Sequence, residues 1–345
     1  MSLLLSDEAS GQHLNHSVYD LLTLLEYKKM KIDIIIVNWN AGTQLKECID
    51  SIQDSGNLYI NKVFVVDNAS SDLSIEIVEK VRWDIDLVII KQSVNYGFGK
   101  ACNIAAQKSS AEYILFLNPD AKIFVNTLPQ VIDFMDKDEN KCVGVCGIQL
   151  IDEAGHVQKH CARLPTIKTY IGHATGLSKI FPKKFPYIFL DEFDHLSSRD
   201  VEHVIGAFYL IRNTLFKELK GFDETFFVYL EDLDLSHRVL EHGKRIHYLG
   251  SASAFHKGGG TSEQVKATRL FYSLRSRMLY GFKHFSKRQA WCLVFLTCII
   301  EFIPRILKAI MKGSIKELNE ILGAYLMLWK GLPKIIKKGN GFEKN

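Results

Sequence analysis

Four short apolar runs, each followed by a polar loop, constrain the fold of this 345-residue chain most strongly. The runs occupy residues 32–37, 62–66, 86–92 and 113–117, and the first reads IDIIIV. Helix-forming segments separate them, at residues 43–52, 74–81 and 99–108. Runs of this kind suit strands that are covered on both faces, and strands that alternate with helices predict a parallel sheet with right-handed crossovers. We therefore expect an α/β protein with a mostly parallel central sheet.

The loops that follow these runs are rich in Asn, Asp, Ser and Gly. They read NWNAG (38–42), DNASSD (67–72), NYGFGKACN (95–103) and NPDA (118–121). Turn chemistry alone would explain one such loop. Because ligands of open α/β sheets bind at the carboxyl ends of the strands, four such loops predict a polar crevice at one edge. The third loop lacks both GxGxxG and GxxxxGK[ST], which argues against a nicotinamide enzyme and a P-loop ATPase.

The composition is that of a globular protein, with 47% hydrophobic and 24% charged residues. Seven cysteines without a CxxC pair indicate neither a disulfide framework nor a zinc ribbon, so we expect a reducing cytoplasm. Residues 1–30 contain LLTLL but lack the basic start and small-residue cleavage site of a signal peptide, and they are treated as an N-terminal extension. No nucleic-acid partner is expected.

Positive charge gathers at the C-terminal end. Residues 283–345 hold 12 Lys or Arg against 4 Asp or Glu, whereas the residues before them carry a net charge of −4. The apolar stretches at 290–310 and 321–336 are interrupted by bases and fall short of the roughly 20 apolar residues of a spanning helix. They favour basic amphipathic helices that lie on an anionic membrane, with Trp291, Phe295, Phe302 and Trp329 inserted. The alternative is that these helices pack on the main domain or on a second copy in a homodimer.

Five motifs follow one another between residues 32 and 262. They are VNWNAG, VVDNASSD, NYGFGKACN, LNPDA and GFDETFFVYLEDLDLSHRV. This set resembles the family 2 glycosyltransferases with the GT-A fold, in particular the bacterial rhamnosyltransferase-like branch. The resemblance implies an inverting enzyme that transfers a sugar from a nucleotide-diphosphate donor to an acceptor hydroxyl with Mg²⁺ or Mn²⁺. It divides the chain into a GT-A domain at 31–265, with a nucleotide-sugar half at 31–125 and an acceptor and catalytic half at 126–265, and a helical region at 266–345.

The candidate metal site combines Asp120 with His256. A hard divalent cation that bridges the diphosphate oxygens neutralises the charge that develops on them, and Asp120 offers it a carboxylate. The family often carries Asp-x-Asp, but Asn118 takes the first position here, so there is one anionic ligand fewer. By resemblance His256 completes the site. The alternatives are a helix cap for Asp120 and a hydrogen-bonded structural role for His256.

The donor-binding candidates lie in the same loops. By resemblance Asp67 hydrogen-bonds the nucleotide base, although an Asx turn would also explain it. The segment 95–103 is expected to close over the nucleotide and sugar, with Gly97 permitting close backbone approach and with Asn95 and Asn103 as direct contacts. The full candidate set is Asn40, Asp67, Asn68, Ser71, Asn95, Gly97, Asn103, Asn118 and Asp120.

Three carboxylates mark the catalytic candidates, at Glu231, Asp232 and Asp234 in the first turn of a predicted helix. The helix dipole favours acidic residues there, and Asp234 is placed to pair with Arg238 four residues on. Inverting transfer needs one carboxylate to take the acceptor proton. By resemblance Asp232 is the general base, and Glu231 orients it or contacts the acceptor.

Other residues receive weaker assignments. His156 and His160 have the i, i+4 spacing of zinc ligands on a helix, but their surroundings predict a hairpin or loop, so both are treated as surface residues. Residues 261–264 are a capping-box candidate that would face the diphosphate. Lys257, Arg275 and Arg277 are phosphate candidates. Residues 165–198 show no recognisable pattern.

The sequence therefore predicts a transferase that moves L-rhamnose from dTDP-rhamnose onto a lipid-linked bacterial surface glycan at the inner face of the cytoplasmic membrane. The alternatives are a transferase with a UDP-hexose donor and a catalytically silent, membrane-attached protein that binds nucleotide sugars. A nucleotidyltransferase is disfavoured because its glycine-rich, basic first loop is replaced here by NWNAGTQ.

Overall fold

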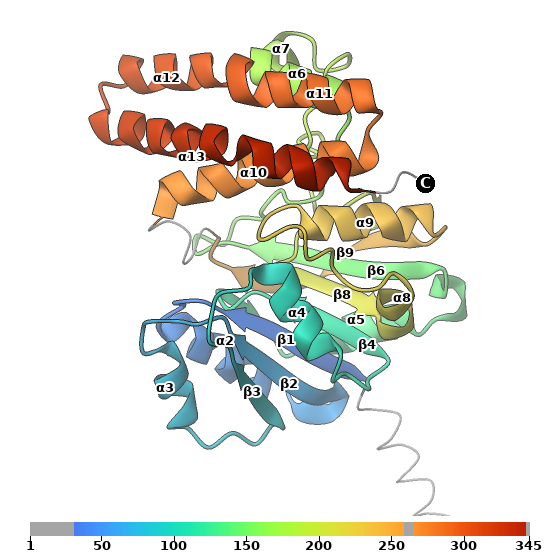
Figure 1. Ribbon diagram of the computed structural model, residues 1–345. Coiled ribbons are helices and arrows are strands. Elements are labelled where there is room, and N and C mark those ends of the chain that lie inside the picture. Colours follow the sequence, from blue (N-terminus) through green and yellow to red (C-terminus); the bar gives the residue numbers. More distant parts are fainter. Residues whose placement is uncertain (1–30, 259–264, 343–345) are drawn as a thin grey trace, which may run out of the picture.

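One mixed nine-stranded sheet forms the centre of the part of the chain that the computed structural model describes, residues 31–258 and 265–342 (Figure 1). The strand order is β3-β2-β1-β4-β8-β6-β9-β5, and β7 pairs with β9. The strands are β1 (Ile32–Asn38), β2 (Ile60–Asp67), β3 (Leu87–Lys91), β4 (Tyr113–Leu117), β5 (Ala121–Ile123), β6 (Val143–Ile151), β7 (Arg199–Val201), β8 (Phe208–Arg212) and β9 (Arg245–His256). Because β1, β2, β3, β4, β6 and β9 run in one direction, the expectation of an α/β protein with a mostly parallel sheet is confirmed.

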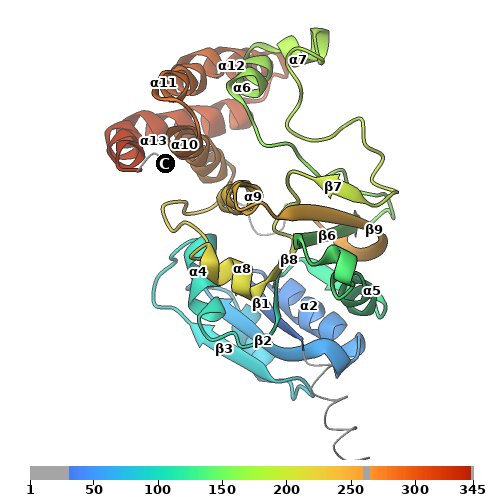
Figure 2. The same ribbon diagram turned by 90° about the vertical axis from the view of Figure 1, so that its right-hand side faces the viewer.

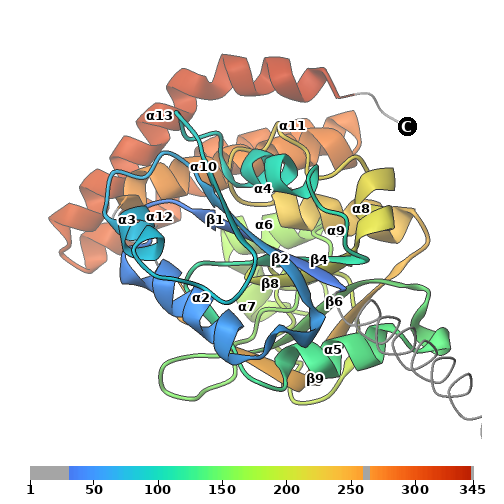
Figure 3. The ribbon, with the colours of Figure 1, turned by 90° about the horizontal axis from the view of Figure 1, so that it is seen from below.

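Helices cover both faces of this sheet (Figure 3). On one face the core cluster includes side chains of α2 (Thr43–Asp54), α3 (Ser74–Glu79) and α5 (Thr127–Met135). On the other face it includes side chains of α4 (Phe98–Ala106), α8 (Asn213–Glu218) and α9 (Glu231–Glu241). Alternate residues of β1 enter the two clusters, Ile34 on the first face and Ile35 on the second. This double burial explains why the first apolar run does not alternate with polar residues.

The second half contains elements that the sequence pattern does not reveal. The region 165–198 holds α6 (Ile167–Thr175) and α7 (Leu177–Ile180). In the first half of the chain, short 3-10 turns lie at η1 (Asn57–Tyr59) and η2 (Asp138–Asn140). A local signal for α6 is present, since the side chain of Thr166 accepts a hydrogen bond from the backbone N–H of Thr169 in a capping box. Thr166 therefore marks the start of a helix in a stretch that otherwise lacks periodicity.

The histidine His160 is not at the surface, so that expectation is wrong. A bridge between Ile151 and Val157 closes the predicted hairpin, and His156 is exposed. The side chain of His160 instead points inward, is 4% exposed, and lies 2.9 Å through Nε2 from the carbonyl oxygen of Ile148. Burial lowers the pKa of His160 to about 3, so its ring is neutral and serves packing.

The C-terminal helices form a bundle above α9 and beside α6 (Figures 1 and 2). They are α10 (Lys266–His284), α11 (Lys287–Phe295), the π-helical turn η4 (Leu296–Ile300), α12 (Phe302–Met311) and α13 (Ile315–Asn340). Their core cluster also contains Phe226 and Leu233 from the sheet-bearing part of the chain. The helices therefore pack on the main domain of their own chain.

One helical segment of the described residues is long and apolar enough to cross a membrane by length and composition, namely Lys287–Met311. The sequence analysis found no spanning helix because it counted only uninterrupted apolar residues. In the structure α11, η4 and α12 are continuous, and together they form a helical segment of 25 residues. Within its most apolar part, 39% is buried against the protein.

Candidate active site

The candidate site lies at the edge of the sheet where the carboxyl ends of several strands meet. Asn38 at the end of β1 is in register with Asp67 at the end of β2, and His256 at the end of β9 is in register with Ala121 at the start of β5. Beyond β4, the backbone N–H of Asn118 donates to the carbonyl oxygen of Ala207 at 3.1 Å. Residues from four separate chain segments therefore share one edge.

Asp67 is held by a buried asparagine that the sequence analysis did not single out. Asn38 Nδ2 donates to Asp67 Oδ1 at 2.9 Å and also contacts the hydroxyls of Ser70 and Ser74 at 3.0 and 2.8 Å. Asp67 Oδ2 receives only a long bond of 3.4 Å from the backbone N–H of Ser70. This oxygen is therefore the atom of Asp67 with the most capacity left for a ligand. The position of Asn38 at the end of the first run is the signal that could have found it.

Hydrogen bonds join the first polar loop (38–42) to the second (67–72). Asn40 has a φ of +54°, and its Oδ1 accepts from the backbone N–H of Ser71 at 2.7 Å. Asp72 Oδ2 accepts from the backbone N–H of Gly42 at 2.8 Å. Asp72 Oδ1 also accepts from the N–H of Ser74, the first residue of α3, at 3.2 Å. Asn40 and Ser71 are thus brought together, and each fixes the loop of the other.

A second set of hydrogen bonds joins the second polar loop to the third, through Asn68, Asn95 and Gly97. Asn68 Nδ2 donates to Asn95 Oδ1 at 2.9 Å and to the carbonyl oxygen of Gly97 at 3.1 Å. Asn95 Oδ1 accepts in addition from the N–H of Gly97 at 2.9 Å. Gly97 has a φ of +84°, and a Cβ there would lie 2.0 Å from the carbonyl oxygen of Phe227. A neighbouring segment therefore approaches the backbone so closely that only glycine fits at this position. That neighbour is the segment around Phe227.

The side-chain amide of Asn103 makes hydrogen bonds within the protein through both its nitrogen and its oxygen. Its Nδ2 donates to the carbonyl oxygen of Phe222 at 2.9 Å, and its Oδ1 accepts from the N–H of the same residue at 2.9 Å. The residue is 9% exposed. The structure therefore places Asn103 as a brace between α4 and the segment before α9, which differs from the direct donor contact expected from the motif.

Asp120 and His256 meet at the same edge. Their side chains are each 9% exposed, and His256 Nε2 lies 3.6 Å from Asp120 Oδ1. Gln158 holds the ring from behind, with its Oε1 2.9 Å from His256 Nδ1 and its Nε2 donating to the carbonyl oxygen of His256 at 2.7 Å. With the proton on Nδ1, the lone pair of Nε2 faces Asp120, as in a metal-binding histidine with an outer partner. Burial lowers the pKa of His256 against the opposing charge of Asp120, which favours the neutral ring. These residues fit a divalent cation.

Asp232 lies at the amino end of α9 and is fixed by two backbone donors. Its Oδ2 accepts from the N–H of Gly206 at 2.9 Å, and its Oδ1 accepts from the N–H of Leu233 at 2.8 Å. The side chain remains 21% exposed, and His203 Nε2 lies 3.9 Å from Oδ2. Burial lowers the pKa of His203, so the neighbouring ring is neutral. Asp232 is an oriented carboxylate that solvent can reach.

The backbone connects Asp120 with Asp232. Asn118, two residues before Asp120, bonds to Ala207, and the adjacent Gly206 bonds to the carboxylate of Asp232. Both aspartates therefore lie at the junction of β4 and β8, on the edge that also carries Asp67 and His256. This junction brings together the predicted metal ligand and the predicted base, which are 112 positions apart in the sequence.

Glu231 is buried next to Asp232. It is 5% exposed, packs against Gly99 at the start of α4, and its Oε2 has no hydrogen-bond partner. Burial, followed by the charge of Asp232, raises the pKa of Glu231 well above its ordinary value. The two adjacent carboxyl groups thus have different environments: Glu231 is buried and favours its protonated form, whereas Asp232 is partly exposed and accepts from two backbone N–H groups.

We expect the substitution E231Q to stabilise the protein by about 1 kcal/mol at neutral pH, because it removes a buried ionisable group whose Oε2 has no hydrogen-bond partner. The folded-state pKa of Glu231 is raised, so its contribution to stability is lost as pH rises from the unfolded value of about 4.5 toward the folded value. Urea unfolding between pH 4 and 8 measures the effect. The gain of E231Q over wild type should grow with pH, and a gain that is constant or falls would contradict the assignment.

The three basic residues that were candidates for phosphate binding have different surroundings in the structure. Lys257 is about half exposed and lies 3.7 Å from Glu153. Arg275 donates to the carbonyl oxygen of Thr225 at 3.1 Å. Arg277 is paired with buried Glu301 in the helical bundle, so its assignment as a phosphate candidate is wrong. The capping-box candidate at residues 261–264 lies outside the described residues.

Gln158, His203 and Gly206 are site residues that sequence reasoning missed. Gln158 lies in the turn region after β6, and Gly206 contributes through its backbone N–H alone. No local pattern marks them, because each acts only through a partner that is distant in the sequence.

Comparison with known proteins identifies the family of this chain. Residues 33–220, more than half of the chain, match the family model described as Glycosyl transferase family 2. Rhamnosyltransferase WbbL of Escherichia coli K12 is 28% identical over 257 residues, covering 72% of this chain and 91% of that protein. The N-acetylglucosaminyl-diphospho-decaprenol L-rhamnosyltransferase of Mycobacterium tuberculosis is 23% identical over 261 residues, covering 72% and 83%.

Solved structures share the fold at lower identity. Staphylococcus aureus TarS 1–349 in complex with UDP-GlcNAc is 19% identical, covers 90% of this chain and 84% of its own, and has a TM-score of 0.51. The mannosyltransferase PcManGT of Pyrobaculum calidifontis in complex with GDP-Man and Mn²⁺ is 16% identical, covers 90% and 84%, and has a TM-score of 0.50. The expected GT-A fold is confirmed. The chain belongs to glycosyl transferase family 2.

Proposed function

We propose that this protein is an inverting transferase that moves L-rhamnose from dTDP-rhamnose to a hydroxyl of a lipid-linked saccharide in bacterial surface glycan synthesis. Two relatives that each match across 72% of this chain are named as rhamnosyltransferases, and the name of the mycobacterial one includes a diphospho-lipid acceptor. The observation that carries the proposal is the meeting of Asp120, His256 and Asp232 at one edge of the sheet. A transferase with these parts needs a donor, a cation and a base at the same place.

The donor would lie over the ends of β1 and β2. In this proposal residues 31–125 form the nucleotide-sugar half and residues 126–265 the acceptor and catalytic half. Asp67 Oδ2 is the acceptor for an N–H of the nucleotide base, because Asp67 Oδ1 is already bonded to Asn38. Asn40, Asn68, Ser71, Asn95 and Gly97 shape the surrounding loops through their mutual hydrogen bonds.

Asp120 and His256 would hold the divalent cation, with Asn118 beside them as a neutral oxygen donor. When bound, the cation neutralises charge on the departing nucleotide diphosphate. An imidazole ligand suits Mn²⁺ better than Mg²⁺, which prefers oxygen. Gln158 keeps the ring of His256 turned toward Asp120.

Asp232 is the proposed general base. Its carboxylate takes the proton from the acceptor hydroxyl as that oxygen attacks the anomeric carbon. The new glycosidic bond forms on the face opposite the breaking bond to the diphosphate, so the anomeric configuration inverts. The N–H groups of Gly206 and Leu233 fix the carboxylate, and Glu231 supports α4 behind it.

Donor turnover tests the proposal directly. The purified protein is given dTDP-rhamnose, UDP-glucose, UDP-GlcNAc or GDP-mannose with Mn²⁺ or Mg²⁺ and a polyprenyl-diphospho-GlcNAc acceptor, and the released nucleotide is measured. We expect release from dTDP-rhamnose only when the acceptor is present. Preferential release from a UDP-sugar would overturn the donor assignment, and no release from any donor would overturn the transferase assignment.

A stripe of exposed apolar side chains on the bundle supports attachment to the inner face of the cytoplasmic membrane. The exposed residues follow steps of four along α11, η4 and α12, which places them on one helix face. They are Trp291, Phe295, Ile299, Ile303, Leu307 and Met311. Leu322, Leu326 and Trp329 of α13 are also exposed, and bases such as Lys308, Lys312 and Lys330 lie between these residues. An apolar stripe with interspersed bases suits an anionic lipid surface.

We expect the double substitution F295E/I303E to weaken binding to vesicles with anionic lipid at least tenfold, because each inserted side chain contributes about 1.5–3 kcal/mol. The matched control is L58E/L73E, which adds the same charge at exposed apolar positions on the sheet-bearing part of the chain. Flotation with vesicles measures the effect. Equal loss in both variants, or a dimer in solution that F295E/I303E disrupts, would show that the stripe does not serve the membrane.

A further inference from the structure

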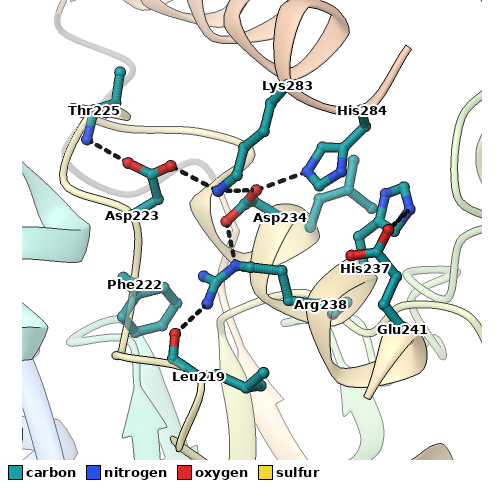
Figure 4. A network of polar contacts seen from close by, with 12 residues as sticks. Leu219, Phe222, Asp223, Thr225, Asp234, His237, Arg238, Glu241, Lys283 and His284 are labelled. Carbon is teal, nitrogen blue, oxygen red and sulfur yellow. Dashed lines mark hydrogen bonds and ion pairs between the residues drawn. The ribbon is translucent and has the colours of Figure 1, made fainter. Parts of the chain in front are cut away.

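One lysine of the C-terminal bundle pairs with two carboxylates that lie on either side of the proposed base in the sequence (Figure 4). Lys283 Nζ on α10 lies 2.6 Å from Asp223 Oδ2 and 2.7 Å from Asp234 Oδ1. Asp223 precedes Asp232 in the chain, and Asp234 follows it in the first turn of α9. A single ammonium group thus joins the two ends of the segment 223–234, and we call this contact the Lys283 bridge.

The Lys283 bridge is largely shielded from water. The side chains of Lys283 and Asp223 are each 19% exposed, and that of Asp234 is fully buried. Burial opposes ionisation of Asp234, but the hydrogen bond from His284 and the charges of Arg238 and Lys283 outweigh it and hold the pKa of that carboxyl well below its ordinary value. Partly buried pairs are screened less by salt than exposed pairs, so the bridge is a fixed contact of the fold.

The segment between the two carboxylates has an unfavourable backbone conformation. Tyr229 and Leu230 both have a φ of +67°, in the left-handed region that costs free energy for residues with a side chain. Leu230 directly precedes α9, so its conformation sets the direction in which the helix, and Asp232 with it, leaves the segment. Because this backbone is not favoured by itself, contacts from neighbouring elements have to hold it.

The middle of the segment is held between α10 and the third polar loop. The hydroxyl of Ser276 on α10 donates to the carbonyl oxygen of Val228 at 2.8 Å. The ring of Tyr272 stacks on that of Phe227, with the centroids 4.6 Å apart. The carbonyl oxygen of Phe227 accepts from the backbone N–H of Phe98, the first residue of α4, at 2.8 Å. These contacts fix the middle of the segment, and the Lys283 bridge fixes its ends.

We propose that Lys283 is a positioning residue of the transfer reaction, which holds the segment 223–234 so that the carboxylate of Asp232 faces the acceptor hydroxyl. This inference rests on the proposed function, because it takes Asp232 as the general base. The rate of transfer depends on this geometry, since a displacement of about 1 Å can lower it about 10²-fold. The C-terminal bundle therefore belongs to the catalytic unit, because α10 provides the bridge.

The substitution K283M tests the inference, because it removes the ammonium group and keeps a long apolar side chain. We expect kcat to fall about 10–100-fold. The dissociation constant of the nucleotide should stay within about threefold of wild type, because Asp67 is held by β1 and the second polar loop. D223N should lower kcat about 3–10-fold. The double variant D223N/K283M should be no slower than K283M, since both substitutions break the same bridge.

The matched control is K31M. Lys31 also pairs with two carboxylates, at 2.5 Å from Asp136 and 3.6 Å from Glu112, and its side chain is 15% exposed. It directly precedes β1, at the end of the strand opposite to the catalytic edge. K31M should keep kcat within about twofold of wild type while it loses a comparable pair. An equal fall of kcat in K31M and K283M would assign the loss to general destabilisation and overturn the inference.

Hydrogen exchange of the full-length protein gives a readout that does not need activity. The amides of residues 223–234 should exchange at least about tenfold faster in K283M than in wild type or K31M. Unchanged exchange in K283M, or unchanged kcat in both K283M and D223N, would overturn the inference. D223N leaves Asp234 with Arg238, Lys283 and His284, so its result does not depend on whether K283M folds. Absence of transfer by the wild type would overturn the proposed function instead, and exchange would then decide on the bridge by itself.

Discussion

The substitution D232N is expected to lower kcat for sugar transfer about 10³-fold, since general-base catalysis contributes about 10²–10⁴-fold. The donor nucleotide should still bind within about twofold of wild type. An asparagine has nearly the same shape, and its oxygen can accept from one of the two N–H groups of Gly206 and Leu233, whereas its NH2 group cannot accept from the other. The substitution therefore removes the capacity to take a proton and one of the two backbone hydrogen bonds, while it keeps the size and shape of the side chain.

The rate of transfer with saturating donor and acceptor measures kcat. Calorimetric titration with the nucleotide measures donor binding. The control is E218Q, because Glu218 is an exposed carboxylate of α8 that pairs with His242. Full activity in D232N would show that another residue is the general base. A protein that binds the nucleotide sugar but has no activity to lose would be the catalytically silent alternative.

The substitution E301Q is expected to destabilise the protein by about 3–5 kcal/mol, because it leaves a buried cation without its partner. Glu301 is 3% exposed and is bonded to Arg277 of α10 and Arg305 of α12. His173 of α6 lies 3.6 Å away, and the guanidinium of Arg277 lies 5.3 Å from the ring of Tyr170 on α6. One carboxylate thus joins α10 and α12 of the bundle to α6, in the segment that precedes β7.

Acid should remove the same stabilisation in the wild type. Burial opposes ionisation of Glu301, but Arg277, His173 and Arg305 outweigh it and hold its pKa below the ordinary value of 4.5. A depressed folded-state pKa contributes stability above the unfolded value, and that stability is lost as pH falls below about 4.5. Urea unfolding at pH 7 and pH 4 should show the difference between wild type and E301Q shrinking on acidification.

The control for this experiment is E317Q. Glu317 pairs with Lys312 at 3.1 Å on the exposed side of the bundle. Exposed pairs contribute at most about 1 kcal/mol, so E317Q should stay close to wild type. An equal effect of the two substitutions, or a difference for E301Q that grows in acid, would contradict the assigned role of Glu301.

The sequence predicts the first half of the fold well because its signals are local. Apolar runs such as 32–37 mark strands that are buried on both faces, and Asn and Asp mark their carboxyl ends. The loop positions of Asp67 and Asp120 follow from strand order alone, since parallel strands end at one edge. The pair of Asp234 and Arg238 also follows, because residues four apart on a helix are neighbours.

Roles that depend on a distant partner do not follow from the sequence in this way. Asn103 lies in a motif expected to contact the donor, yet its amide bonds to Phe222 far along the chain. Arg277 is a phosphate candidate by its sequence, but its counter-ion Glu301 lies 24 residues away on another helix. His160 reads as a surface residue, but β9 places Tyr248 against its ring.

The sequence by itself determined the α/β class, the edge that carries the polar loops and the adjacency of Glu231 and Asp232, because each depends on residue type and on spacing within one element. Only the tertiary structure decided that Glu231 is hidden while Asp232 reaches solvent, that Gln158 supports His256, and that Lys283 pairs with both Asp223 and Asp234. Burial and hydrogen-bond partners arise from packing between elements that are distant in the chain, and local spacing carries no information about them.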